Sequence, residues 1–303
     1  MLALFGPTAS GKSAIAHALA REMGGEVIVA DPFQRYRGLE IAADAPPTAA
    51  REEIRYHLVG DLSLADDSTA GAYAAEAHRA VDEVIARDAL PILAGGTGLY
   101  LRAALCELEM RPPPPAAVRE WAEGLAADPT AALAELEARD PEAALAVDAT
   151  NPRRLARALE RAATGEAGAG DDIWAAPYRR PTLLVLIDRP GEVLNALIAQ
   201  RVRRELDDGL EQELAAALDT RDLARGPAQV IGMAEVRAIR DGALEADALE
   251  DALCARTRRL ARMQRTWMRR MDPDLLLDLG DRPAQTAVPE IAALVRRRRE
   301  GVV

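Results

Sequence analysis

Lys12 is the only lysine of this 303-residue chain, which uses arginine for its other positive side chains. It stands in the segment GPTASGKS, which runs from Gly6 to Ser13. A lysine ammonium is a compact charge that fits between phosphate oxygens, whereas the planar guanidinium of arginine does not fit a tight phosphate nest. We therefore predict that Lys12 binds a phosphate group.

The spacing of Gly6, Gly11, Lys12 and Ser13 is the phosphate-loop pattern. An apolar run, Leu2–Phe5, predicts a buried strand before the loop, and helical spacing of apolar residues follows it. In such a loop the backbone N–H groups and the helix dipole converge on an anion, and the serine hydroxyl binds Mg²⁺. The alternative is a glycine-rich turn without a ligand, which the order of strand, loop and helix disfavours. The pattern does not identify the phosphate compound.

The elements that must position this loop alternate between apolar strand-like runs and helical segments. We expect strands at Leu2–Phe5, Glu26–Ala30, Val81–Ile85 and Leu90–Ala94, which predicts an α/β fold with a parallel sheet flanked by helices. Ligands of open parallel sheets bind beyond the carboxyl ends of the strands. Three polar or glycine-rich segments fall there, so we interpret them as one site: Gly6–Ser13, Asp31–Gly38 and Gly95–Tyr100.

The pattern breaks at Arg111–Pro115, because consecutive prolines continue neither a helix nor an inner strand. Residues 116–164 are alanine-rich with helical periodicity, Gly165–Asp172 closes them off, and Thr182–Ile187 predicts another buried strand. We expect a phosphate-loop core over 1–112, a helical insertion over 113–180, and the rest of the core with a basic C-terminal helix over 181–303. Helices over Glu192–Leu218 and Leu249–Met271 are expected to pack on the core.

Composition indicates an ordinary globular protein of the reducing cytoplasm. The two cysteines and three histidines form neither a disulfide framework nor a zinc constellation. No apolar run reaches membrane-spanning length, and the chain enters the predicted strand without room for a signal peptide. The net charge of −11 taken alone argues against a nucleic-acid partner.

The distribution of charge changes that conclusion, because the segment from Asp251 to Arg270 contains seven arginines and only one acidic residue. Helical steps of about 100° place one row of arginines in a narrow sector. That row is Arg258, Arg262, Arg265 and Arg269, with Leu260, Met263, Trp267 and Met271 on the opposite side. The ordinary interpretation is a helix with a solvated polar face and an apolar core face. However, the arginines of this row repel one another and have no acidic residue between them, so an anionic ligand would stabilise the row, which favours binding to a phosphate backbone. A second row, Arg154, Arg157 and Arg161, repeats the design, and the run Arg296–Arg299 is interpreted as a solvated tail, with an RNA contact as the alternative.

Six segments in one order, GPTASGKS, DPFQRYRG, GGTGLY, NPRRLARALE, QVIGMAEV and TRRLARMQRTW, resemble the tRNA dimethylallyltransferase (tRNA isopentenyltransferase) family over essentially the whole chain. The resemblance implies a phosphate-loop α/β core with a helical insertion that grips the anticodon stem-loop of tRNA. It also implies transfer of a dimethylallyl group from dimethylallyl diphosphate to N6 of the adenosine 3′ of the anticodon. Mg²⁺ is the implied cofactor, and we expect a monomer.

The resemblance assigns roles to particular residues of this chain. It implies Asp31 as the base that takes the proton of the adenine amino group, with Thr97 and Arg201 as further catalytic residues. The diphosphate cradle would consist of Gly6, Pro7, Thr8, Ala9, Ser10, Gly11, Lys12 and Ser13, with Ser13 as the metal ligand. Contacts to tRNA would come from Asp31, Pro32, Phe33, Gln34, Thr97, Arg119, Arg153, Arg154, Arg157, Arg258, Arg262, Arg265 and Arg269. From the residues alone, Asp31 and Thr97 are also compatible with ordinary turn positions.

The chemistry requires the same residue types. An adenine amino group is a weak nucleophile, so a carboxylate that accepts its proton accelerates transfer by roughly 10²–10⁴-fold. Negative charge grows on the leaving diphosphate, which Lys12, Arg201, Mg²⁺ and backbone amides would stabilise. The target base must also leave its stack to enter a pocket.

The chain departs from the family pattern at several positions. Pro32 replaces a serine, Arg35 a valine, Met233 a tyrosine and Met263 an arginine, and Ala42-Ala43-Asp44-Ala45-Pro46 replaces a Gly-Thr-x-Lys-Pro segment. These changes bear on the expected tRNA contacts more than on the diphosphate site.

Two other functions fit parts of the sequence. A prenyltransferase for free adenine nucleotides would share the loop and the base, but it would not need the arginine rows. A phosphate-loop NTP-dependent kinase or switch would need an aspartate that closes an apolar strand for Mg²⁺. The strand Leu90–Ala94 instead ends in Gly95-Gly96, and Asp188, after Thr182–Ile187, is followed by Arg189-Pro190. A nucleotide-binding regulator without chemistry is a further alternative, because phosphate-loop patterns also occur without catalysis.

Overall fold

The computed structural model describes residues 1–108, 114–165 and 173–301. The predicted break at Arg111–Pro115 and the predicted loop Gly165–Asp172 lie mostly outside these residues. The chain divides into two compact units, one formed by residues 1–107 and 177–303 and the other by residues 108–176. We describe each unit by itself.

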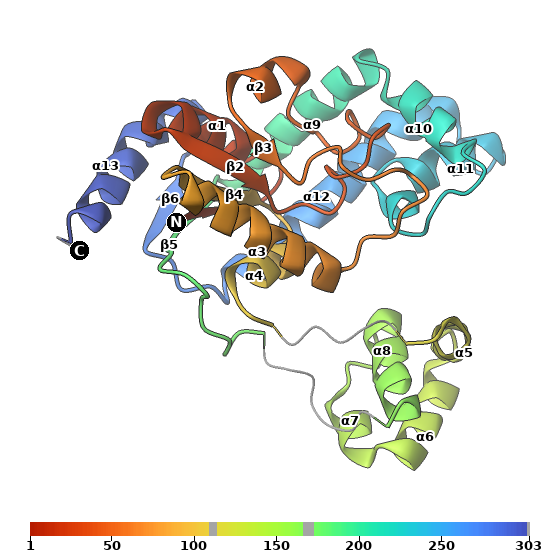
Figure 1. Cartoon of the computed structure of the whole chain (residues 1–303). Helices are drawn as coiled ribbons and strands as arrows, with labels where there is room; N and C mark the ends of the chain where they lie inside the picture. Colours follow the sequence, from red (N-terminus) through yellow and green to blue (C-terminus); the bar gives the residue numbers. More distant parts are fainter. Residues whose placement is uncertain (109–113, 166–172, 302–303) are drawn as a thin grey trace. The chain divides into compact units, whose positions relative to one another are not determined.

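The first unit is built on a sheet of six parallel strands in the order β3-β2-β4-β1-β5-β6 (Figure 1). The strands are β1 (Leu2–Phe5), β2 (Gly25–Val29), β3 (Tyr56–His57), β4 (Leu90–Gly95), β5 (Leu183–Asp188) and β6 (Leu275–Asp278). The prediction of an α/β fold with a parallel sheet is confirmed.

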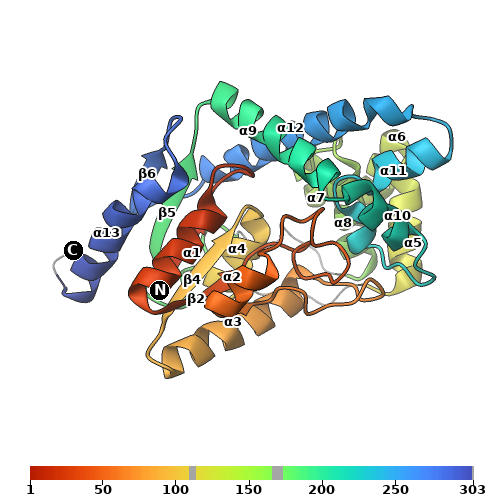
Figure 2. The ribbon, with the colours of Figure 1, turned by 90° about the horizontal axis from the view of Figure 1, so that it is seen from above.

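Helices connect the strands and cover the sheet. In the first unit they are α1 (Lys12–Met23), α2 (Thr48–Glu53), α3 (Ala70–Ala86), α4 (Gly98–Leu105), α9 (Gly191–Asp207), α10 (Leu210–Leu218), α11 (Met233–Arg240), α12 (Leu249–Met268) and α13 (Val288–Arg299), with short 3₁₀ helices at Pro227–Gln229, Ala246–Ala248 and Ala284–Ala287. Figure 2 shows α9 and α12 side by side. These two helices form part of a second hydrophobic cluster with α10 and α11.

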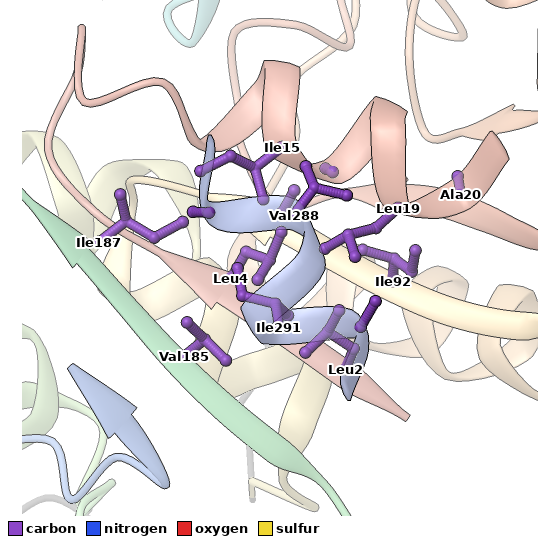
Figure 3. Close-up of a cluster of buried hydrophobic side chains, with 14 of the residues drawn as sticks. Leu2, Leu4, Ile15, Leu19, Ala20, Ile92, Val185, Ile187, Val288 and Ile291 are labelled. Carbon is purple, nitrogen blue, oxygen red and sulfur yellow. The ribbon is translucent and has the colours of Figure 1, made fainter. Parts of the chain in front are cut away.

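The central core lies between the sheet and the helices α1 and α13 (Figure 3). Alternate residues of β1 point to one face, so Leu2 and Leu4 share it, while Ile15 and Leu19 lie one turn apart on α1 and meet them there. All four side chains are fully buried. Burial of each such side chain stabilises the fold by about 1.5–3 kcal/mol, which fixes the start of α1 against the end of β1.

The sheet register brings the ends of three strands together. Phe5 of β1 pairs with Gly95 of β4, and Val29 of β2 pairs with Ala94. Because β4 lies between β1 and β2, the segments that follow these three strands leave the sheet at one edge.

Two predicted elements differ in the structure, and two strands were not predicted. Val81–Ile85 lies within α3 and is not a strand, because its apolar residues continue a helical spacing through Tyr73 and Ala77. The predicted helix Glu192–Leu218 is broken at Gly209, whose φ of +99° cannot continue a helix. Strands β3 and β6 were not predicted, since a two-residue strand and the run Leu275–Asp278 carry little pattern.

The second unit consists of α5 (Ala116–Leu125), α6 (Pro129–Arg139), α7 (Pro141–Ala146) and α8 (Pro152–Ala163). Asp128, Asp140 and Asn151 cap the last three of these helices with their side-chain oxygens. The core is made of small and aliphatic side chains, such as Ala132, Leu136 and Leu155. The assignment of a tRNA contact to this unit stays a prediction.

The cysteines Cys106 and Cys254 are buried free thiols. Within residues 1–108, 114–165 and 173–301, no helix is long and apolar enough to cross a membrane.

Candidate active site

A cavity of about 890 Å³ opens at the edge where β1, β2 and β4 end. It is lined by the phosphate loop, the end of β2, the segment 42–47 and residues of α9 and α12. The predicted site residues that line it are Thr8, Ala9, Gly11, Lys12, Ser13, Asp31, Phe33, Gln34 and Arg201. The structure thus brings the loop, the candidate base and the candidate arginine into one cavity.

The phosphate loop turns sharply between β1 and α1. Gly11 has a φ of +99° and caps α1, and Ala9 has a φ of +62°, a conformation that is costly for a residue with a Cβ. At Gly6 a Cβ would lie 2.3 Å from the carbonyl oxygen of Ile187, so only glycine fits there. The N-terminus of α1 is thereby aimed at the cavity, where its first N–H groups and its dipole favour an anion.

Lys12 folds back over this loop, with its Nζ 3.4 Å from the carbonyl oxygen of Pro7. Burial lowers the pKa of Lys12 to about 8, against the opposing effect of Asp31. An anionic ligand beside this ammonium would favour its charged form and raise its pKa again, so Lys12 is suited to pair with such a ligand.

Two long-range contacts hold the loop from behind. The Oε1 atom of Gln264, a buried residue of α12, accepts a hydrogen bond from the backbone N–H of Thr8 at 2.7 Å. Arg189, which is also buried, donates from Nε to the carbonyl oxygen of Ser10 at 3.0 Å. Its Nη1 donates to the carbonyl oxygens of Gly280 and Arg282. The strained Ala9 is therefore clamped on both sides.

Asp31 follows β2 and faces the cavity from the opposite side of the loop. Its Oδ1 accepts a hydrogen bond from the backbone N–H of Phe33 at 2.9 Å, which fixes the carboxylate in the turn after β2. Burial raises the pKa of Asp31 above its ordinary value, although the bond from Phe33 and the charges of Lys12 and Arg201 oppose the rise. A carboxylate of raised pKa is a stronger base toward a substrate proton.

Arg201 of α9 reaches the loop from the other wall. Its Nη1 donates to the hydroxyl of Thr8 at 2.7 Å, and its Nε donates to Glu205 at 2.6 Å. Asp44 lies 3.1 Å from the same Nη1. Burial alone would lower the pKa of Arg201, but Asp44 and Glu205 hold it above its ordinary value.

Thr97 stands just before α4, and the cavity-lining residues of the described part of the chain do not include it. The glycines beside it have a packing role. A Cβ at Gly96 would lie 2.3 Å from Nε2 of Gln264, and a Cβ at Gly98 would lie 2.3 Å from the ring of Trp267. The glycine-rich segment therefore lets α12 approach the end of β4.

The arginine row of α12 is not uniform. Arg262 and Arg269 are exposed and Arg258 is partly buried. Arg265 instead donates to the carboxylate of Asp188 at 2.9 Å and to the carbonyl oxygen of Arg189.

Met263 was expected on the core side of α12, but it is 52 % exposed. From Thr257 onward, the buried positions of α12 are Thr257, Ala261, Gln264 and Met268, so the core face is rotated toward the phosphate loop. The polar buried residues of this face explain why hydrophobic spacing misplaced it.

In the second unit, Arg153, Arg154 and Arg157 are exposed on α8, and Arg119 on α5 is partly buried. Arg157 forms an ion pair with Glu160 at 2.6 Å. The part of its guanidinium away from Glu160 faces solvent.

Four residues of this site were not predicted: Asp44, Glu205, Gln264 and Arg189. Gln264 stood in a motif that resembled the family, so its presence there was a usable signal. Glu205 lies four residues after Arg201 on one helix, which is the spacing of a helical ion pair. Asp44 and Arg189 gave no signal, because their partners lie far away in the sequence.

A family model described as IPP transferase matches residues 34–271. The chain belongs to this family. Among curated relatives, the tRNA dimethylallyltransferase of Kineococcus radiotolerans is 39 % identical over 90 % of this chain and 88 % of its own length. That of Kocuria rhizophila is 36 % identical over 93 % and 90 %.

Solved structures agree with this membership in the IPP transferase family. The tRNA isopentenylpyrophosphate transferase of Bacillus halodurans superposes with a TM-score of 0.73 at 27 % identity, covering 99 % of this chain and 97 % of that one. A eukaryotic dimethylallyltransferase acting on tRNA gives a TM-score of 0.80 at 21 % identity over 99 % and 79 %, which shows the shared fold.

Proposed function

We propose that this chain transfers a dimethylallyl group from dimethylallyl diphosphate to N6 of the adenosine that follows the anticodon of tRNA, releasing diphosphate. The supporting observation is one cavity in which a phosphate loop, a carboxylate of raised pKa and a paired arginine meet. Family membership and the names of the relatives support the same activity.

The reaction exchanges one bond for another. The N6 lone pair forms a bond to C1 of the dimethylallyl group while the bond from C1 to the diphosphate oxygen breaks, and its electron pair leaves with the diphosphate. The proton of N6 passes to the carboxylate of Asp31. Lys12, Arg201 and the N–H groups at the start of α1 stabilise the charge that accumulates on the leaving group.

Mg²⁺ fits this site as an ion that arrives with the diphosphate. Among the described residues, no group of three or more His, Cys, Asp or Glu side chains could hold a metal ion alone. Mg²⁺ commonly binds through one or two protein oxygens together with substrate phosphates and waters, and the hydroxyl of Ser13 lies at the cavity for that purpose. Bound in this way, the ion would neutralise charge on the diphosphate.

On the tRNA side, the proposal assigns Phe33 and Gln34 to the flipped base, and Arg262, Arg269 and the exposed arginines of α8 to the RNA backbone. The proposed acting species is a monomer.

An NTP-dependent kinase or switch is disfavoured by Asp188. In such proteins the aspartate at the end of a neighbouring strand assists Mg²⁺. Here Asp188 accepts hydrogen bonds from Arg265 and from its own neighbour Arg189, and it is not among the described residues that line the cavity.

The test is transfer of radiolabelled dimethylallyl into unmodified tRNA whose anticodon is followed by adenosine, with AMP as a rival acceptor. Asp31→Asn removes the base and keeps the turn, so it should reduce transfer roughly 10²–10⁴-fold while tRNA binding persists. The matched control is Asp219→Asn, an exposed aspartate that pairs with Arg240 at the far end of α10.

Label in tRNA that depends on Asp31 supports the proposal. Full transfer by Asp31→Asn would remove the mechanism. Label in AMP alone would assign the protein to free nucleotides, and ATP turnover without transfer would assign it to the NTP-dependent class.

A further inference from the structure

Asp44 places a second carboxylate in the cavity, at a position of unusual backbone geometry. It ends the turn formed by residues 39–45 and has a φ of +50°. The turn is held on its N-terminal side by Glu213, whose carboxylate accepts hydrogen bonds from the N–H groups of Ile41 and Ala42 at 2.9 and 2.8 Å. The Nε2 of Gln34 donates to the carbonyl oxygen of Asp44 at 3.3 Å. The position of this carboxylate is therefore fixed by the fold.

Asp44 is paired with the arginines of α9. One of its oxygens lies 3.1 Å from Nη1 of Arg201, and the other lies 3.2 Å from Nη2 of Arg204. The same Nη1 donates to the hydroxyl of Thr8 in the phosphate loop. Asp44 thus occupies the side of the Arg201 guanidinium that faces the loop, where a diphosphate would bind.

Apart from Arg21, which has its own partner in Glu53, the charged side chains that line the cavity balance before any ligand arrives. The cavity is lined by the cations Lys12, Arg21, Arg201 and Arg204 and by the anions Asp31, Asp44 and Glu205, and Arg21 pairs with Glu53 outside the lining. A diphosphate brings several negative charges into this neutral set. Burial lowers the pKa of Lys12, and the charge of Asp44, after that of Asp31, opposes this lowering. The incoming anion must therefore either displace Asp44 from Arg201 or arrive with a cation of its own.

We propose that Asp44 is an internal counter-ion that competes with the diphosphate for Arg201, and that it thereby makes binding of the diphosphate depend on Mg²⁺. This inference rests on the proposed function for the identity of the ligand. It adds a residue that sets donor affinity, and that residue lies in a segment where its neighbours depart from the family pattern.

Removal of the negative charge should raise the affinity for diphosphate mainly when Mg²⁺ is absent. In Asp44→Asn, Arg201 loses one competitor and the diphosphate loses one repelling neighbour. Asparagine adopts a positive φ readily, so the turn is retained. Asp44→Gly tolerates the same φ without a side chain, so agreement between the two variants separates charge from shape.

The experiment measures the dissociation constant of inorganic diphosphate for the full chain by calorimetry, with Mg²⁺ and with EDTA. We expect the wild type to bind at least about tenfold more weakly in EDTA than in Mg²⁺. Both Asp44 variants should recover most of that loss, and Asp219→Asn, the exposed aspartate paired with Arg240, should behave as the wild type.

Two results would overturn the proposal. Unchanged Mg²⁺ dependence in both Asp44 variants would show that this carboxylate does not compete with the diphosphate. Weaker binding of the variants in Mg²⁺ alone would show instead that Asp44 binds the cation. Prenyl transfer to tRNA is measured separately, so a failure of the proposed function is visible even when the diphosphate data support the role of Asp44.

Discussion

The side-chain oxygen of Gln264 lies 2.7 Å from the backbone nitrogen of Thr8, although 256 positions separate the two residues. Gln264 belongs to α12, whose exposed side carries Arg262, and the exposed Arg269 caps the C-terminus of this helix. One helix therefore presents arginines to solvent on one side and supports the phosphate loop with the other.

Replacement of Gln264 by leucine should weaken diphosphate binding about tenfold, because the N–H of Thr8 loses its acceptor and the loop loses a clamp beside Ala9. The free energy of unfolding should fall by about 1–3 kcal/mol. Gln264→Glu keeps an acceptor and should retain most of the stability. Calorimetry and thermal melting measure both effects, with Thr266→Ala as a control on the same helix. Unchanged diphosphate affinity in Gln264→Leu would mean that the loop holds its shape unaided.

Added methyl groups should have opposite effects at two glycines. Gly98→Ala places a Cβ against the ring of Trp267 and should cost about 1–3 kcal/mol. Gly124→Ala in α5 meets no atom within 4 Å and should stabilise its helix by about 1 kcal/mol. Hydrogen exchange of the amides in α4 and α5 reports each effect locally. Normal protection of α4 in Gly98→Ala would show that Trp267 gives way.

Diphosphate affinity should fall as the pH rises through about 8, the lowered pKa of Lys12. Above that pH the free protein loses the ammonium that binds the anion. The free energy of unfolding should instead rise with pH between about 8 and the ordinary lysine value of 10.5. In that window the unfolded chain binds more protons than the folded one, so the cost of burying the Lys12 charge disappears. Calorimetry between about pH 7 and about pH 9.5 tests the prediction. Lys12→Arg stays charged and should bind with no such decline, even if it binds weakly.

The arginines of α12 should separate into two groups. Arg262→Gln and Arg269→Gln should each lower the salt dependence of tRNA binding by about one counter-ion while stability stays constant. Arg265→Gln should instead lower the free energy of unfolding by about 1–2 kcal/mol, because Asp188 loses its partner. Arg240→Gln removes the same charge from α11 and serves as the control. If Arg240→Gln changes the salt slope as much as the other two, the effect reflects net charge and not a binding surface.

The phosphate loop and the sheet were predictable because their signals are local. Leu2–Phe5 is a continuous apolar run, and the glycines of Gly6–Ser13 meet steric demands of the loop itself. Val81–Ile85 was misassigned because a short apolar run fits a buried strand and a buried helix equally well. β6 was not predicted because it is a four-residue edge strand that forms by pairing with β5, and its own sequence carries little strand pattern.

The support of the site was not predictable in the same way. Arg189 and Gln264 are polar residues that hydrophobic spacing assigns to the surface, yet both are buried against the loop. Their burial is favourable only because each finds partners that are distant in sequence. Asp44, which lies in a turn, depends likewise on Arg201 of α9, a residue far away in the sequence.

Because the single lysine lies in the phosphate loop, its chemical reactivity can report whether a ligand occupies the loop. The ε-amino group of Lys12 at the phosphate loop is the only lysine amine of the chain. Its lowered pKa leaves part of it as a reactive free amine near neutral pH. The α-amino group aside, an amine-directed reagent therefore addresses one atom. Protection of that atom, followed by mass spectrometry, would report occupancy of the loop on the unmodified protein without an engineered label.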